Sequence, residues 1–198
     1  MLRFHCQPET EEAGELVEFR LIYEGPLDPQ TSQSRVEEKH AIRRALHPQL
    51  KELWNQFPFL HRNLDYYADQ YHRDGFRFIP LVSARQARFC TLDILFLRRD
   101  MPGNLIANGG DIDNRIKVLF DGLRITRNRE ELGGATPQVD EDPFFCLLED
   151  DSLITEVKIT TDRILRPVGA GNIHDVVLII HVKTGVKTGA VDMDEVFG

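Results

Sequence analysis

The chain has 198 residues, enough to bury the core of one domain, and a formal net charge of −8 at pH 7. This acidic balance argues against a protein that binds nucleic acid through charge alone, although carboxylates that ligate metal ions would contribute to it. No apolar run is long enough to span a bilayer and no apolar signal-peptide core follows Met1, so we expect a cytoplasmic protein without a membrane partner.

The cysteines do not predict a structural site. Cys6, Cys90 and Cys146 are odd in number, lie far apart and form no Cys-x-x-Cys pair. A disulfide framework and a zinc knuckle are therefore unsupported, and we expect reduced thiols.

The first half of the chain begins with a strand and continues into a helical region. Residues 16–23 alternate apolar and polar side chains, which is typical of a half-buried strand. Apolar residues then recur at spacings of three and four, so we expect helices over 34–47 and 49–57 that are interrupted by Pro48. A short helix or an irregular segment over 63–72 follows.

Two further strands complete this half. Residues 76–82 predict a short strand that is weakened by Pro80. Residues 87–98 alternate, and their middle is apolar on both faces, as in an interior strand. In the first predicted helix we expect Arg43 and Arg44 on the polar side, away from the apolar residues.

The second half predicts a helix and several strands around a polar insertion. After a loop, the apolar spacing indicates a helix over 114–123. The polar residues 124–143 are typical of a flexible surface insertion. The remaining segments are a short strand or turn over 144–148, a strand over 153–164, a hairpin-type connection over 169–172 and a closing strand over 175–182.

Strands and helices without a regular βαβ alternation predict the α+β class. We expect a single domain over residues 1–183, in which a mixed or antiparallel sheet packs against helices. This domain would carry a helical excursion at 34–72 and a surface insertion at 124–143. A mobile acidic tail would follow at 184–198.

Chemically active groups are concentrated around the start of the central helix. The stretch that follows two glycines contains three carboxylates, one amide and one ammonium group: Asp111, Asp113, Asn114, Lys117 and Asp121. In an extended segment Asp111 and Asp113 would point to the same side, and two such carboxylates repel each other unless a cation lies between them. Oxygen ligands favour a hard ion, Mg²⁺ or Mn²⁺. Alternatively, one aspartate simply caps the helix.

Two further features qualify this interpretation. On a helix, Lys117 and Asp121 share a face, so they can form an ion pair. A second acidic stretch, residues 149–151, precedes a predicted strand, where an acidic turn is common. It would belong to a metal site only if the fold brought it beside Asp111 and Asp113.

The pattern Asp-x-Asp-Asn-x-x-Lys-x-x-x-Asp-x-Leu, followed by Asp-Asp-x-x-Ile and a strand with a lysine, resembles the RusA family of Holliday-junction resolvases. The residues that carry it are Asp111, Asp113, Asn114, Lys117, Asp121, Leu123, Asp150, Asp151, Ile154 and Lys158. The resemblance implies a RusA-like fold and a Mg²⁺-dependent endonuclease, in which Mn²⁺ can substitute. Such an enzyme acts as a homodimer on branched DNA and resolves four-way junctions in recombination and repair.

The resemblance also implies a role for each matching position. Asp111, Asp113 and Asp151 would be catalytic residues that bind the metal. Lys117 would be the catalytic lysine near the scissile phosphate. The other charged or amide positions would support the site: Asn114, Asp121, Asp150 and Lys158.

The chain departs from the family in length and charge. Residues 124–143 lengthen a link that is short in the family, residues 34–72 add a helical region, and the net charge is acidic where a junction binder is expected to be basic. Two alternatives therefore stay open. One is a catalytically weak or inactive RusA-like module that binds DNA or protein, and the other is a nuclease that acts on another substrate, such as a flap or RNA.

Overall fold

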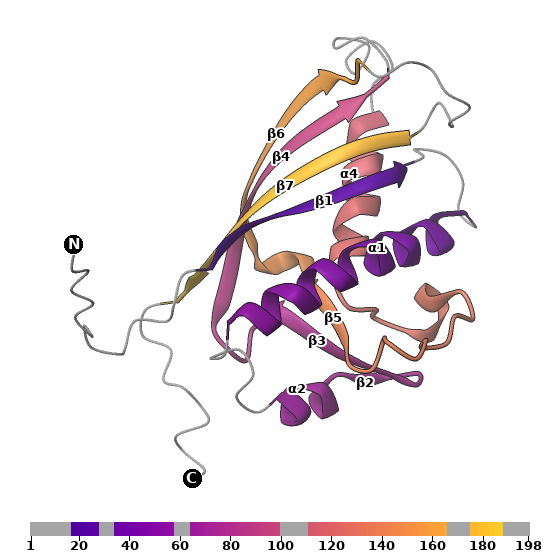
Figure 1. The fold of residues 1–198 in the computed structure, drawn as a ribbon, viewed down its shortest axis with the longest axis vertical. Coiled ribbons are helices and arrows are strands. Elements are labelled where there is room, and N and C mark those ends of the chain that lie inside the picture. The colour runs from indigo at the N-terminus through magenta and orange to yellow at the C-terminus, as the bar shows by residue number, and fades with distance from the viewer. Residues whose placement is uncertain (1–16, 28–33, 58–63, 100–110, 166–174, 188–198) are drawn as a thin grey trace, which may run out of the picture.

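Two β-sheets with helix α1 between them form the fold in the computed structural model (Figure 1). The described residues are 17–27, 34–57, 64–99, 111–165 and 175–187, without the side chains of Ser34, Arg35 and Asp111. They make one α+β domain, as the sequence predicts. No helix in these ranges is both long and apolar enough to cross a membrane.

The larger sheet has four strands in the order β1-β7-β4-β6. Its strands are β1 (Glu18–Pro26), β7 (Asp175–Val186), β4 (Arg88–Arg98) and β6 (Ile154–Arg163). β7 pairs antiparallel with both β1 and β4, whereas β6 pairs parallel with β4, so the sheet is mixed. The prediction of an interior strand over 87–98 is confirmed, because β4 has a partner on each side.

The smaller sheet contains β2 (His72–Arg73), β3 (Phe76–Val82) and β5 (Phe144–Leu148). β3 pairs antiparallel with β2 and parallel with β5, and Pro80 lies opposite Cys146 in the parallel pair. Every residue of β5 is buried. A run that is apolar throughout is what a strand covered on both faces requires.

Helix α1 (Ser34–Gln56) is continuous, so the predicted interruption at Pro48 is wrong. A proline inside a helix costs about 3 kcal/mol, because it removes one backbone hydrogen bond and crowds the preceding turn. Ile42, Leu46 and Leu50 flank Pro48 and are each at most 2% exposed. Full burial of such side chains contributes roughly 1.5–3 kcal/mol each, which exceeds the cost of the proline.

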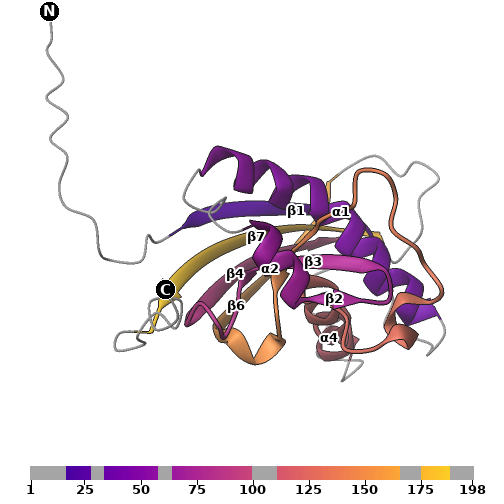
Figure 2. The same cartoon turned by 90° about the horizontal axis from the view of Figure 1, so that it is seen from below.

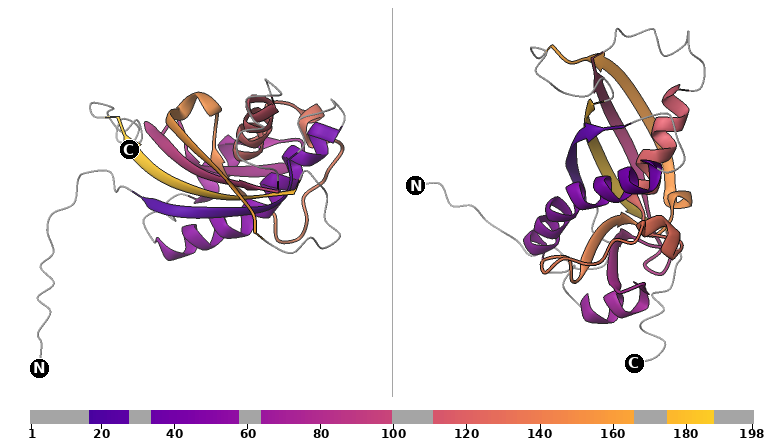
Figure 3. Two further views of the ribbon diagram at one scale, coloured as in Figure 1. Left: turned by 90° about the horizontal axis from the view of Figure 1, so that it is seen from above. Right: turned by 90° about the vertical axis from the view of Figure 1, so that its right-hand side faces the viewer.

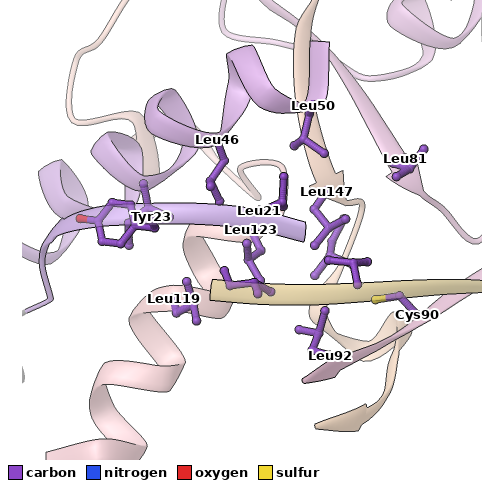
Figure 4. Packing of buried hydrophobic residues seen from close by; sticks show 14 of the residues in the cluster. Leu21, Tyr23, Leu46, Leu50, Leu81, Cys90, Leu92, Leu119, Leu123 and Leu147 are labelled. Atoms are coloured by element: carbon purple, nitrogen blue, oxygen red, sulfur yellow. The ribbon is translucent and has the colours of Figure 1, made fainter. Parts of the chain in front are cut away.

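The core lies between the larger sheet and two helices, α1 and α4 (Asp111–Leu123). Figure 4 shows the leucines that α1 (Leu46, Leu50) and α4 (Leu119, Leu123) contribute to this cluster, together with leucines of the strands. Gly122 permits the close approach of the two helices, because a Cβ there would lie 2.7 Å from the Ile42 side chain. The views in Figures 2 and 3 show α1 and α4 on one face of the curved sheet.

The segment over 124–143 is integrated into the fold, which differs from the flexible surface insertion that its composition suggests. Ile125 and Leu132 are buried, and Leu132 ends a short 3₁₀ helix, η2 (Arg129–Leu132), that contacts α1. Ile125 donates its N–H to the carbonyl oxygen of Leu148 in β5. The segment therefore carries part of the second apolar cluster.

The remaining predicted boundaries need two adjustments. The predicted short segment over 63–72 forms α2 (Leu64–Gln70). β7 continues through Val186, so the predicted tail cannot begin at residue 184. Residues 188–198 of that tail and the predicted connection at 169–172 lie outside the described residues.

Candidate functional site

Helix α4 begins at Asp111, earlier than predicted. Asp111 and Asp113 therefore belong to its first turn, and the expected extended segment is wrong. Two positions that are two residues apart on a helix lie about 200° apart around its axis, so they do not share a face. Helical apolar spacing begins at Ile112, which packs against the core, and this extends the helix to its acidic start. Carboxylates in a first turn also interact favourably with the helix dipole.

Lys117 pairs with Asp113, one turn before it. The Lys117 Nζ atom lies 2.6 Å from the Asp113 Oδ2 atom. The two side chains are 67% and 65% exposed, so this pair contributes only about 0.3–0.5 kcal/mol to stability. The cost of separating the two groups is therefore small, and both are accessible to a ligand.

Asp121 does not pair with Lys117, although the spacing allows it. Its carboxylate lies 2.6 Å from both Lys39 Nζ and Arg124 Nη2. Burial raises the pKa of Asp121, but hydrogen bonds and charges from Lys39 and Arg124 outweigh this effect and bring the pKa below its ordinary value. These contacts give Asp121 a structural role at the end of α4.

Arg124 is 2% exposed and joins this ion pair to the following segment. Its Nη2 and Nη1 atoms donate to the two carboxylate oxygens of Glu131, each at 2.9 Å. Arg43, also 2% exposed, donates to the backbone oxygens of Asp121 and Arg124 at 2.6 and 2.9 Å. The prediction of Arg43 on the polar side of its helix is wrong, because α1 uses it to satisfy the carbonyl groups at the end of α4.

Arg44, the neighbour of Arg43, leaves the core but does not point to open solvent. Its guanidinium makes a bidentate contact with Glu141, at 2.7 and 3.1 Å. Glu141 is 4% exposed. This contact ties the far end of the 124–143 segment to α1.

The second acidic stretch forms the turn before β6. Asp150 caps the 3₁₀ helix η3 (Asp151–Leu153) by accepting a hydrogen bond from the Ser152 N–H at 3.0 Å. Arg127 Nη2 donates to Asp150 Oδ2 at 3.0 Å and to Asp151 Oδ1 at 2.9 Å. The hydrogen bonds from Ser152, with the Arg127 guanidinium, hold the pKa of Asp150 well below its usual range.

The two acidic stretches lie toward opposite ends of α4. Asp113 precedes Leu123 by ten residues, or about 15 Å of helix rise. At the other end, Arg124 forms an isolated β-bridge with Leu148, which immediately precedes the acidic turn. Figure 1 shows this end of α4 beside β5. The described residues therefore give no direct contact between Asp113 and Asp151.

The resemblance also assigns supporting roles to Asn114 and Lys158, and neither residue lies in the two clusters described above. Asn114 is half-buried in α4. Lys158 pairs with Asp93 across β4 and β6, at 2.8 Å between Nζ and Oδ2. Among the residues with described side chains, which exclude Asp111, no three His, Cys, Asp or Glu side chains converge as metal ligands.

Arg127 is the residue that sequence reasoning missed. The sequence shows only an arginine among several that follow the central helix, and no local pattern links it to carboxylates more than twenty positions away.

Comparisons of the chain with protein-family models, with curated proteins and with solved structures give no match.

Proposed function

We propose that the chain is a Mg²⁺-dependent endonuclease that acts as a homodimer on branched DNA, with the four-way junction as substrate. The observation that carries the proposal is the exposed Asp113–Lys117 pair in the first half of α4. A carboxylate and an ammonium group one helical turn apart offer a metal ligand beside a cation that can face a phosphate. The sequence resemblance assigns catalytic roles to these same residues.

The donor set suits a hard divalent cation. Asp113 and Asp151 provide carboxylate oxygens, and by sequence Asp111 adds a third carboxylate. A bound Mg²⁺ would supply charge neutralisation and an activated water at the scissile phosphate. The Lys117 ammonium would stabilise negative charge that develops on the phosphate oxygens.

The homodimer is part of this proposal for a geometric reason. Because Asp113 and Asp151 lie toward opposite ends of α4, the described residues of one chain do not present both to one ion. A two-fold dimer can place Asp151 of one subunit near Asp113 of the other. Asp151 would then have to exchange its contact with Arg127 for the metal.

A second candidate function is a RusA-like module that binds DNA or a protein without cleavage. The contacts of Arg127 with both Asp150 and Asp151 favour it, because they offset part of the negative charge of the turn and give it a structural explanation. In this case the Asp113–Lys117 pair would be an ordinary exposed pair on a helix.

Cleavage of a labelled four-way junction by the purified full-length protein tests the proposal. The junction is incubated with Mg²⁺ or Mn²⁺ beside flap, duplex and single-stranded RNA controls. We expect junction cleavage that Asp113→Asn abolishes. The matched control Asp142→Asn, which removes an exposed carboxylate paired with Arg77, should leave cleavage unchanged.

The outcomes separate the candidates. Faster cleavage of a flap or of RNA would replace the junction as substrate. Junction binding without cleavage would favour the binding module. If the unmodified protein cleaves none of these substrates with either ion, the nuclease proposal is refuted.

A further inference from the structure

Strand β6 forms an exposed edge of the larger sheet. Most of its residues are exposed, including Val157 at 39%, and no described strand pairs with its outer side. The opposite edge differs, because the Gln49 side chain bonds both the N–H and the carbonyl oxygen of Ile22 in β1, at 2.9 and 2.7 Å. At Ile22 the Gln49 side chain of α1 therefore occupies the backbone groups of the β1 edge, whereas β6 presents backbone groups for pairing.

The backbone bonds to β4 show which groups of β6 point outward. Ile164 donates its N–H to the Arg98 carbonyl oxygen at 2.8 Å. The even-numbered residues of β6 therefore direct their backbone N–H and carbonyl groups toward β4. Backbone direction alternates along a strand, and the register with β4 is regular from Thr91 to Arg98. Val157, Ile159 and Thr161 therefore direct their N–H and carbonyl groups to the outer edge.

The charges of β6 alternate in sign on one face. Glu156, Lys158 and Asp162 lie on the side of Asp93, which Lys158 contacts, and this is the face opposite α1 and α4. When a strand pairs with its own copy about a two-fold axis, the residue on the axis determines which charges meet. Like charges that are directly opposite destabilise the pair, and opposite charges stabilise it.

The possible registers differ in these contacts. With Lys158 on the axis, two lysines meet. With Ile159 on the axis, Glu156 of each copy meets Asp162 of the other. With Thr160 on the axis, Lys158 of each copy lies opposite Asp162 of the other, and the overlap includes residues 156–164.

One other register is also charge-complementary. With Val157 on the axis, Glu156 lies opposite Lys158, but the overlap within the strand and its flank is shorter, at residues 154–160. The Thr160 register therefore combines opposite charges with the greater number of paired backbone groups.

We propose that two copies of this chain associate through antiparallel pairing of their β6 strands, with Thr160 on the two-fold axis and Lys158 opposite Asp162 of the partner subunit. The pairing would join two four-stranded sheets into one continuous sheet. This inference rests on the homodimer of the proposed function and identifies its interface. Its tests use neither DNA nor metal, so its failure and the failure of the nuclease proposal are distinguishable.

The first test compares two charge reversals by light scattering and sedimentation across a range of concentrations. We expect a dimer for the unmodified chain. Asp162→Lys places like charges together twice in the interface, so the dissociation constant should rise about tenfold or more. Glu156→Lys is the matched control, because Glu156 would lie opposite apolar Ile164 of the partner subunit, and its dissociation constant should stay within about threefold of the unmodified value.

The second test identifies the register by disulfide formation in a Cys6→Ser background. The backbone N–H and carbonyl groups of Thr160 point toward β4, so the two copies of Thr160 would form a non-hydrogen-bonded pair across the interface. The Cα atoms of such a pair are about 4.5 Å apart, which is close enough for a disulfide. We expect Thr160→Cys to give a covalent dimer on mild oxidation.

The opposite results would overturn the proposal. A monomer at all concentrations excludes the interface. A dimer that Glu156→Lys weakens and Asp162→Lys does not, or that Val157→Cys cross-links in place of Thr160→Cys, excludes the register. Circular dichroism of each variant establishes that it is folded, so that loss of the dimer is not loss of the fold.

Discussion

The substitution Arg124→Met should destabilise the fold strongly, although it preserves much of the side-chain volume. The Arg124 guanidinium donates to Asp121 Oδ1 at 2.6 and 3.1 Å and to both carboxylate oxygens of Glu131. Methionine removes all these donors and leaves both carboxylates in a partly buried site. Asp121 would retain Lys39 as a partner, whereas Glu131 would lose its bidentate contact.

The magnitude follows from burial. Removal of one partner of a buried ion pair costs about 3–5 kcal/mol. The two carboxylate side chains, Asp121 and Glu131, are 22% and 18% exposed, so water would relieve part of this cost. We therefore expect a loss of about 2–3 kcal/mol in the free energy of unfolding. For a chain of this length, that corresponds to a decrease in Tm of roughly 5–10 °C.

Urea and thermal unfolding, followed by circular dichroism, measure this loss. Lys117→Met is the matched control, because it removes an exposed ion pair on the same helix and should cost at most about 0.5 kcal/mol. If Arg124→Met also costs less than about 0.5 kcal/mol, the buried network does not stabilise the fold and the reasoning is refuted.

The same network predicts a dependence on pH. Burial raises the pKa of both Asp121 and Glu131. Lys39 and Arg124 outweigh this effect at Asp121, and Arg124 with the Arg127 N–H outweighs it at Glu131, so both pKa values are lowered in the folded state. The stabilisation is therefore present above the unfolded-state pKa values near 4 and is lost as pH falls through the folded values. Arg124→Met should lose less stability than the unmodified protein over this acidic range.

Three further predictions concern single side chains. Lys117→Met should reduce junction cleavage about 10²-fold or more, because it removes one donor that stabilises the transition state. Calorimetry should show that the variant still binds Mg²⁺. Unchanged cleavage would remove Lys117 from the mechanism. Burial, assisted by nearby arginines, lowers the pKa of His40 to about 4. The free energy of unfolding should therefore fall from pH 6.5 to pH 4, because only the unfolded state takes up the proton over this range. In urea titrations, His40→Phe should lack this part of the pH dependence. Burial also raises the pKa of the Cys90 and Cys146 thiols to about 12. Mass spectrometry should therefore show that iodoacetamide labels them only after urea is added. Rapid labelling of the native protein would contradict their burial.

Local periodicity was sufficient for most of the elements. The alternation over 87–98 correctly predicted an interior strand, and the apolar spacing after the glycines correctly predicted a helix. Both patterns depend on contacts that repeat every two or every three to four residues, so a short stretch of sequence contains the necessary information. The α+β class follows from the order of these elements.

The tertiary structure determined which polar residues are structural. Arg43 looks solvent-exposed in its own helix, yet it is buried because the end of α4, about eighty positions later, needs hydrogen-bond donors. Likewise, the helix is continuous through Pro48 because Leu46 and Leu50, on either side of the proline in the chain, pack in a core shared with distant strands.

In the candidate site, too, some properties follow from the sequence and others only from the tertiary structure. Its residue types and spacing are properties of the sequence, and they motivate a metal-dependent nuclease. The placement of Asp113 and Asp151 toward opposite ends of α4, and the contact of Arg127 with the acidic turn, depend on how α4 packs against β5. These contacts join residues far apart in the chain, and no local pattern encodes the free energy that selects them.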